Sequence, residues 1–300
     1  MSLATVRITS PGGETEAEFV PGAGLLCSSL RHRGVELLDP GRGVDAYAQR
    51  GKTMGIPLLY PWANRLSRPG YAAAGATVDL PDPEGRYPTD PSGLPIHGAL
   101  PGDMVWEAGG TGDGVLHATL DWDAPALREL FPFAHRVECA AAVTERGLTL
   151  TTTVHASGGD RVPIAFGYHP YLTLPGSSRA GWQVDLGATE RLELDDHMIP
   201  TGARTPLEHP DFLLADSSWD DGLAGLRTPA QFLVSDGERA LSASFEAGYD
   251  WAQVYAPPGH DYICFEPMTA PTDALNSGVG LTVIEPGESY RASFTIDVTP

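Results

Sequence analysis

Four short segments of this chain place ionisable side chains beside residues that fix the backbone. A histidine stands in residues 94–98, a second in 165–171, a glutamate in 262–269 and an Asn-Arg pair in 55–66. Each lies at or beside the end of an apolar, strand-like run, with proline or glycine next to it. Imidazole and carboxylate are the groups that serve as general acid and general base near neutral pH. The four segments therefore suggest a site for paired proton transfer.

Taken singly, each segment is better explained as a strand end or a turn, where proline and glycine are common. His97 alone is explained as a loop histidine, and Glu266 alone as a carboxylate at a strand end. The combination of Arg65, His97, His169 and Glu266 in similar settings is what favours a common site.

Residues 262–269 also indicate which side of a strand would carry the carboxylate. Side chains of a strand alternate between its two faces. Glu266 therefore shares a face with Tyr262 and Cys264, opposite Ile263 and Phe265. We expect the polar face to belong to the site.

Aromatic residues stand close to the ionisable ones. They are well suited to stack on the apolar face of a sugar ring. The candidates are Tyr60, Trp62, Tyr168 and Tyr171.

The rest of the chain must position these segments, and its hydrophobic pattern has a period of two. Alternating or strand-like runs predict ten strands, separated by turns rich in glycine and proline. They cover residues 115–122, 137–143, 148–154, 162–168, 182–186, 191–194, 231–235, 241–245, 251–255 and 290–298. Only short helices are expected, with candidates at 124–130 and in a turn around 273–276. The pattern is typical of an all-β, antiparallel sandwich or barrel-like fold.

Composition limits the classes of partner. The 300 residues carry a formal net charge of −20, which disfavours nucleic acid and membrane surfaces and weakly disfavours phosphorylated substrates. No linker is evident, so we expect one domain over residues 1–300. The first residues lack a secretion signal and no apolar run is long enough to cross a bilayer, so the cytoplasm is the expected compartment.

No metal or cofactor is expected. The sequence has no P-loop, no HExxH and no GxSxG motif. The three cysteines are expected to be buried free thiols: Cys27, Cys139 and Cys264. The other histidines are expected on the surface or in packing: His32, His117, His135, His155, His197, His209 and His260.

The four segments resemble those of the aldose 1-epimerase family, within the galactose mutarotase-like group. In that family an Asn-Arg pair precedes a His-Gly, a Tyr-His-Pro motif follows, and a Glu-Pro segment lies near the C-terminus. Order and rough spacing agree over residues 55–269. The resemblance implies a large antiparallel β-sandwich and a monosaccharide substrate whose α and β anomers are interconverted, with no cofactor.

The resemblance also implies roles. His169 matches the general acid that protonates the ring oxygen, and Glu266 matches the base that takes the anomeric hydroxyl proton. Arg65 and His97 match residues that bind the sugar, and Asn64 matches the residue that shapes the loop beside the arginine. The substrate-binding set is completed by Trp62, Tyr168 and an aspartate in the segment 219–223, for which Asp220 is preferred and Asp221 stays open.

Three other functions stay open. A hexose-6-phosphate epimerase needs cations for the phosphate, and five occur near the Asn-Arg segment in sequence: Arg31, Arg33, Arg50, Lys52 and Arg68. A non-catalytic sugar-binding protein of this fold is the second. A glycoside hydrolase or lyase is the third, although a hydrolase usually needs two facing carboxylates.

The sequence contains no recognisable signal for which sugar is preferred. The loops expected to carry it, residues 81–95 and 200–218, hold no known motif. The preferred sugar and the oligomeric state are therefore left open.

Overall fold

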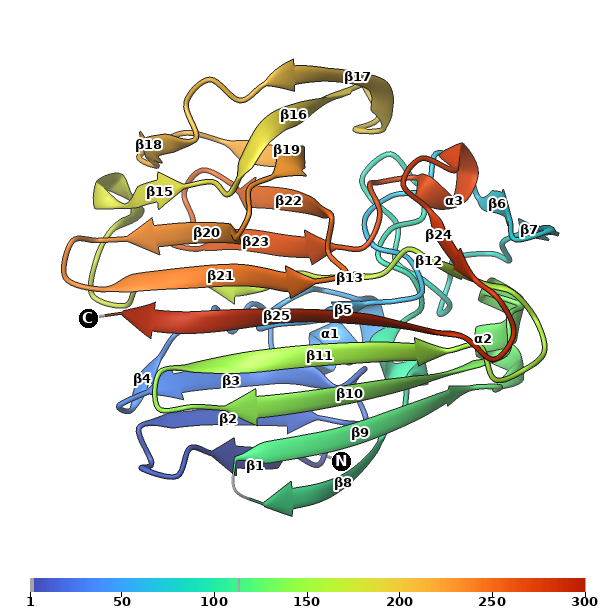
Figure 1. Cartoon of the computed structure of the whole chain (residues 1–300), viewed down its shortest axis with the longest axis horizontal. Helices are drawn as coiled ribbons and strands as arrows, with labels where there is room; N and C mark the ends of the chain where they lie inside the picture. Colours follow the sequence, from blue (N-terminus) through green and yellow to red (C-terminus); the bar gives the residue numbers. More distant parts are fainter. Residues whose placement is uncertain (1–2, 113, 300) are drawn as a thin grey trace.

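Two large antiparallel sheets dominate the computed structural model, which describes residues 3–112 and 114–299 (Figure 1). The nine-stranded sheet runs, in spatial order, β18 (Asp211–Leu213), β15 (Gln183–Asp185), β20 (Ala230–Ser235), β21 (Ala240–Ala247), β25 (Ser289–Thr299), β11 (Gly147–His155), β10 (His135–Val143), β9 (Val115–Trp122) and β8 (Glu107–Gly112). Figure 1 shows β25 beside β11 in the middle of this sheet.

The eight-stranded sheet carries the segments of interest. Its order is β17 (Pro200–Pro206), β16 (Ala188–Leu194), β19 (Trp219–Leu226), β22 (Trp251–Ala256), β23 (Ile263–Met268), β13 (Gly167–Tyr168) and β5 (Leu58–Leu59), and β14 (Tyr171–Leu172) also pairs with β23.

Smaller elements complete the chain. A four-stranded sheet holds β1 (Val6–Thr9), β2 (Thr15–Val20), β3 (Leu26–His32) and β4 (Val35–Glu36), and two-stranded sheets join β6 (Gly70–Ala73) to β7 (Ala76–Asp79) and β12 (Val162–Ile164) to β24 (Thr282–Ile284). The short helices are α1 (Val44–Arg50), α2 (Pro125–Leu130) and α3 (Ala274–Ser277), with 3-10 turns η1 (Pro101–Asp103) and η2 (Arg179–Gly181). Within the described ranges no helix is both long and apolar enough to span a bilayer.

The two large sheets pack face to face through their apolar residues. Leu150 of β11 pairs with Phe294 of β25, and both side chains are buried. Phe232 of β20 and Phe265 of β23 place their ring centroids 5.7 Å apart and so connect the two sheets. Burying a side chain of this size stabilises the fold by roughly 1.5–3 kcal/mol. The predicted β-sandwich is confirmed, and its core follows the period-two pattern.

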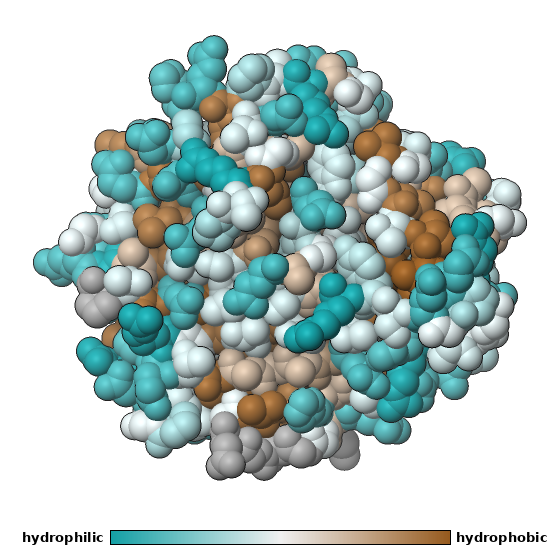
Figure 2. Space-filling model, in the orientation of Figure 1, coloured by the Kyte–Doolittle hydropathy of each residue, from teal (hydrophilic) through white to brown (hydrophobic). Residues whose placement is uncertain are grey.

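The face of the molecule seen in Figure 2 is mostly hydrophilic or intermediate in hydropathy, with hydrophobic residues in smaller groups. The three cysteines are buried and free, as expected.

Two predicted boundaries were wrong. The run 162–168 is two strands in different sheets, because β12 pairs with β24 whereas β13 pairs with β23 and β5. A continuous apolar run cannot show where the chain leaves one sheet for another. The loop expected at 200–218 contains β17 and β18. β17 is an edge strand whose residues are almost all exposed, so it carries no alternation.

Backbone pairing ties the Asn-Arg segment to the His-Gly segment. The N–H of His97 donates to the carbonyl of Asn64 at 2.9 Å, and Gly98 bridges Tyr60. Gly98 has φ of +77°, and a Cβ placed on it would lie 2.0 Å from the Tyr60 carbonyl oxygen. Only glycine permits this approach, which holds the two segments together.

We expect Gly98→Ala to lower the free energy of unfolding by more than about 3 kcal/mol, because it adds a backbone clash to the strain of a positive φ. Gly34→Ala is the matched control, since Gly34 has φ of +78° and open space around it. It should cost only about 1–2 kcal/mol. Urea unfolding measures the loss of unfolding free energy in both variants. Equal losses would show that the close approach to Tyr60 is not the reason that glycine is needed at position 98.

Candidate active site

Strand register places His169 opposite Glu266. Gly167 pairs with Met268 and Tyr171 pairs with Cys264, so His169, midway along its segment, lies opposite Glu266 on β23. Pro170 interrupts the ladder between β13 and β14, which leaves His169 outside the named strands. Two residues almost a hundred positions apart thus meet through ordinary antiparallel pairing.

The His169 and Glu266 side chains lie in contact. Nε2 of His169 is 3.3 Å from Oε1 of Glu266, and the two residues are only 5% and 1% exposed. Among the described residues, neither Nδ1 of His169 nor Oε2 of Glu266 has a side-chain or backbone partner elsewhere in the chain. Buried polar atoms are normally hydrogen-bonded, so these two atoms are available to a ligand.

Burial sets the ionisation of both groups. It raises the pKa of Glu266 well above its ordinary value, with a further contribution from Asp220. It lowers the pKa of His169 well below its ordinary value, with a smaller contribution from His97. Both shifts favour the neutral forms, so the pair holds one proton between them over a wide range of pH.

Asp220 and Glu266 lie on one face of the sheet, on the two strands that flank β22. Asp220 pairs with Tyr255 across β19 and β22, and Gln253 pairs with Glu266 across β22 and β23. The Gln253 amide donates to Oδ1 of Asp220 at 2.7 Å. Alternation places Asp221 on the other face, where its carboxylate lies 3.5 Å from Arg191. Of the two adjacent aspartates, Asp220 is the one that lines the pocket.

Arg65 is held among acceptors that offset its charge. Its Nε donates to Oδ2 of Asp90 at 3.0 Å, its Nη1 donates to Oδ1 of Asn64 at 3.1 Å, and its Nη2 lies 3.6 Å from Oδ2 of Asp220. The Arg65 and Asp90 side chains are 13% and 4% exposed. Arg65 therefore brings directed N–H donors to the pocket with little net positive charge.

His97 lies across the pocket from the sheet. Its ring meets that of His169 edge to face, with centroids 5.7 Å apart. Burial, aided by nearby Arg65, lowers the pKa of His97 to about 3, so its imidazole is neutral. Its Nδ1 has no recorded partner in the described part of the chain. His97 and Asn64 both have positive φ, 63° and 56°, a strained conformation found often at functional sites.

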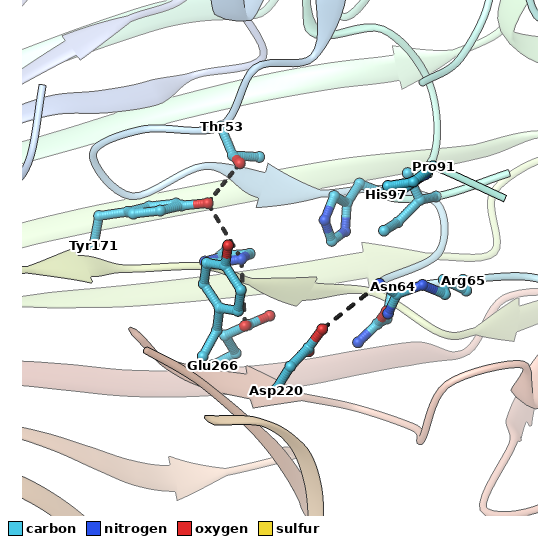
Figure 3. A pocket seen from close by; sticks show the side chains of 11 residues that line it. Thr53, Asn64, Arg65, Pro91, His97, Tyr171, Asp220 and Glu266 are labelled. Atoms are coloured by element: carbon cyan, nitrogen blue, oxygen red, sulfur yellow. Dashed lines mark hydrogen bonds and ion pairs between the residues drawn. The ribbon is translucent and has the colours of Figure 1, made fainter. Parts of the chain in front are cut away.

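These side chains surround a cavity of about 350 Å³, a volume suited to a small molecule (Figure 3). Its walls are Thr53, Asn64, Arg65, Pro91, Ile96, His97, His169, Tyr171, Asp220, Tyr255 and Glu266. Within residues 3–112 and 114–299, no three His, Cys, Asp or Glu residues are grouped so as to hold a metal ion.

Two expected sugar-binding residues lie elsewhere. Trp62 is 1% exposed in the core, and Tyr168 packs on Phe294 while its hydroxyl contacts that of Thr152 at 2.7 Å. Neither lines the cavity, because both side chains face the interior of the sandwich. Tyr60 is buried in the same core.

The aromatic rings at the cavity are Tyr171 and Tyr255. Tyr255, Thr53, Pro91 and Ile96 were not identified from the sequence. Tyr255 carries a usable signal, because it lies two residues from Gln253 and shares its face of β22. Thr53 follows a helix in a loop, and its sequence neighbourhood offers no comparable signal.

Known proteins match this chain over nearly its whole length. The family model described as aldose 1-epimerase matches residues 12–297. The uncharacterized protein YihR of Escherichia coli (strain K12) is 26% identical over 99% of this chain and 94% of its own.

Solved structures share the fold. A galactose mutarotase-like protein from Clostridium acetobutylicum superposes with a TM-score of 0.83 at 18% identity, over 98% of this chain and 95% of that one. Galactose 1-epimerase from Lactobacillus acidophilus NCFM superposes with a TM-score of 0.72 at 14% identity, over 99% of each chain.

The buried carboxyl of Glu266 should cost stability at high pH. Because its pKa is raised on folding, the unfolded chain ionises first, and stability is lost as the pH rises above the ordinary value of 4.5. Glu266→Gln should therefore change the free energy of unfolding little at about pH 4 and raise it by about 1 kcal/mol at about pH 8. Urea unfolding at both pH values tests this, with the exposed Glu84→Gln as control. An equal gain in the free energy of unfolding at both pH values would contradict the raised pKa of Glu266.

Proposed function

The chain belongs to the aldose 1-epimerase family, and on this premise we propose that it interconverts the α and β anomers of free aldohexoses such as glucose or galactose. The observation that carries the proposal is the buried contact between His169 and Glu266 in a cavity of sugar size. Both side chains line the cavity, Oε2 of Glu266 is unpartnered within the described part of the chain, and the proton that the pair shares is what a reversible acid–base exchange requires.

The favoured neutral forms place the shared proton on Glu266, so ring opening begins once it has passed to Nε2 of His169 across the 3.3 Å contact. Glu266 takes the proton of the hydroxyl on C1, and His169 gives its proton to the ring oxygen as the bond between C1 and that oxygen breaks. The C1 oxygen becomes the aldehyde oxygen, and the pair again holds one proton, now on Glu266. After rotation about the C1–C2 bond, the two transfers run backwards and close the ring on the other face.

The short distance between the two groups suits this chemistry. The C1 hydroxyl oxygen and the ring oxygen are bonded to the same carbon, so their proton-transfer partners must be neighbours. Arg65, neutral His97 and Asp220 are placed to hydrogen-bond the other hydroxyl groups of the sugar.

The charges around the cavity favour a free sugar over a 6-phosphate. Arg65 is the one Lys or Arg among the described residues lining it, and two aspartates flank Arg65. Arg31 and Arg33 are paired with glutamates of the small β1–β4 sheet and its turn. A phosphate in the cavity would face Asp220 and Glu266, and the described residues that line the cavity offer it no Lys or Arg free of an acidic partner. Rates measured side by side on glucose and glucose 6-phosphate separate the two substrates.

Anomer exchange followed by polarimetry tests the proposal. Wild-type protein should speed the equilibration of fresh α-D-glucose or α-D-galactose, and His169→Asn should lower kcat by at least about 100-fold, because it removes the acid. Glu266→Gln should lose comparable activity. A sugar that binds without faster exchange would indicate a binding protein, and release of reducing ends from a glycoside would indicate a hydrolase.

The shared proton predicts a broad pH profile. A second proton binds only below the lowered pKa of His169, and the last one leaves only above the raised pKa of Glu266. We therefore expect kcat/KM to be level between the ordinary values of 4.5 and 6.5 and still level at about pH 7. The uncatalysed rate is subtracted at each pH, and circular dichroism confirms the fold. A decline in kcat/KM that begins between pH 4.5 and pH 6.5 would rule out the shared proton of His169 and Glu266.

A further inference from the structure

We propose that Thr53 and Tyr171 are positioning residues whose two hydroxyl groups hold the His169 ring in both of its protonation states. The inference rests on the proposed function, because it concerns how one histidine acts as acid in ring opening and as base in ring closure. It adds to the acid–base pair a hydrogen-bonded chain that runs from Thr53 through Tyr171 to His169.

Tyr171 lies flat against the His169 ring. The two ring planes differ by 3° and their centroids are 4.4 Å apart. The Tyr171 hydroxyl oxygen is 2.6 Å from Oγ1 of Thr53 and 3.4 Å from Nε2 of His169 (Figure 3). The Tyr171 backbone N–H donates to the carbonyl of Gly55 at 2.8 Å, and the strand pairs with β23. Backbone pairing therefore fixes the tyrosine on which the histidine rests.

His169 lacks the anchor that usually orients a catalytic imidazole. In most histidine sites the nitrogen that does not react is held by a carbonyl or carboxylate, which fixes ring and tautomer. Here Nδ1 makes no hydrogen bond to another residue within the described ranges. Nε2 faces both Glu266 and the Tyr171 hydroxyl. Orientation of the ring must then come from the side of Nε2.

A hydroxyl group suits this place because it both donates and accepts. When Nε2 carries a proton, its N–H lies in the ring plane and faces Glu266, while the Tyr171 hydroxyl over the ring donates to Thr53. When the proton has gone to the sugar, Tyr171 donates to the bare Nε2, and Thr53 donates to Tyr171. The change requires only that two O–H bonds rotate, and no covalent bond forms or breaks.

Of the groups around His169, Tyr171 is the one suited to orient the ring throughout the reaction. Glu266 and His97 approach from β23 and from the loop, and Tyr255 meets the ring edge to face at 5.7 Å. Glu266 gains and loses a proton during the reaction, so it cannot be a constant partner of the ring. Neutral His97 meets the ring edge to face and does not hold Nε2. Burial raises the pKa of Tyr171 well above its ordinary value, so its hydroxyl stays protonated and serves as a partner rather than as a proton carrier.

Turnover measurements on matched variants test the chain of hydroxyls. Tyr171→Phe keeps the stacked ring, and Thr53→Val keeps the size of the threonine. We expect Tyr171→Phe to lower kcat about 10-fold or more, with KM within about twofold, because the histidine loses its alignment. Thr53→Val should lower kcat in the same way, and Thr53→Ser should recover most of that loss. Tyr290→Phe, which removes a hydroxyl bonded to Gly248, is the remote control.

A second measurement does not depend on turnover. The ring nitrogens of His169 are observed by ¹⁵N NMR on histidine-labelled protein without sugar, and are assigned by their loss in His169→Asn. Their resonances should move in Tyr171→Phe and Thr53→Val, return towards wild type in Thr53→Ser, and stay in place in Tyr290→Phe. If the variants show these shifts but the wild-type protein does not speed anomer exchange, the hydrogen-bonded chain is supported and the proposed function is removed. If Tyr171→Phe keeps kcat within about twofold of wild type and leaves the His169 resonances in place, the hydrogen-bonded chain is overturned while the proposed function stands.

Discussion

The cost of burying an acid and a base side by side is the constraint on which the site depends. His169 and Glu266 are almost inaccessible to solvent, and burial shifts both towards their neutral forms. Such a pair persists only where the backbone gives it no alternative. Antiparallel register supplies that restraint, since the pairs on either side of His169 fix it opposite Glu266. The large core behind β23, including Phe265 against Phe232, holds the register.

Around this rigid pair the remaining polar groups are arranged so that little net charge is exposed to a ligand. Arg65 lies between Asp90 and Asp220, and His97 is kept neutral by burial and by that same arginine. The positive φ of Asn64 and His97 shows that the backbone is strained to bring these groups inward. A neutral polyol can satisfy such a lining with hydrogen bonds alone, which is consistent with the free sugar that we propose as substrate.

The sequence predicted the parts of the site that follow from local pattern. Alternation along β23 placed Glu266 on the polar face and Phe265 in the core, and the sandwich followed from the same periodicity. It could not tell which face of a neighbouring segment meets the cavity, so Trp62 and Tyr168 were assigned to the sugar although they pack between the sheets. Thr53 joins the site only through loop closure across many residues, and no local pattern records that contact.

The acceptor that holds Arg65 in place belongs to a surface loop rather than to the sheet. Asp90 lies in residues 81–95, and its other carboxylate oxygen accepts the N–H groups of Ser92 and Leu94, so the loop braces its own aspartate. The His169–Glu266 pair and the support of Arg65 thus come from different parts of the fold, the large sheet and a surface loop. Changes in this loop can reshape the wall at Pro91 and the hold on Arg65 while β23 keeps its register. For the activity that we propose, this loop is therefore where evolution or library design can change selectivity without altering the acid–base pair.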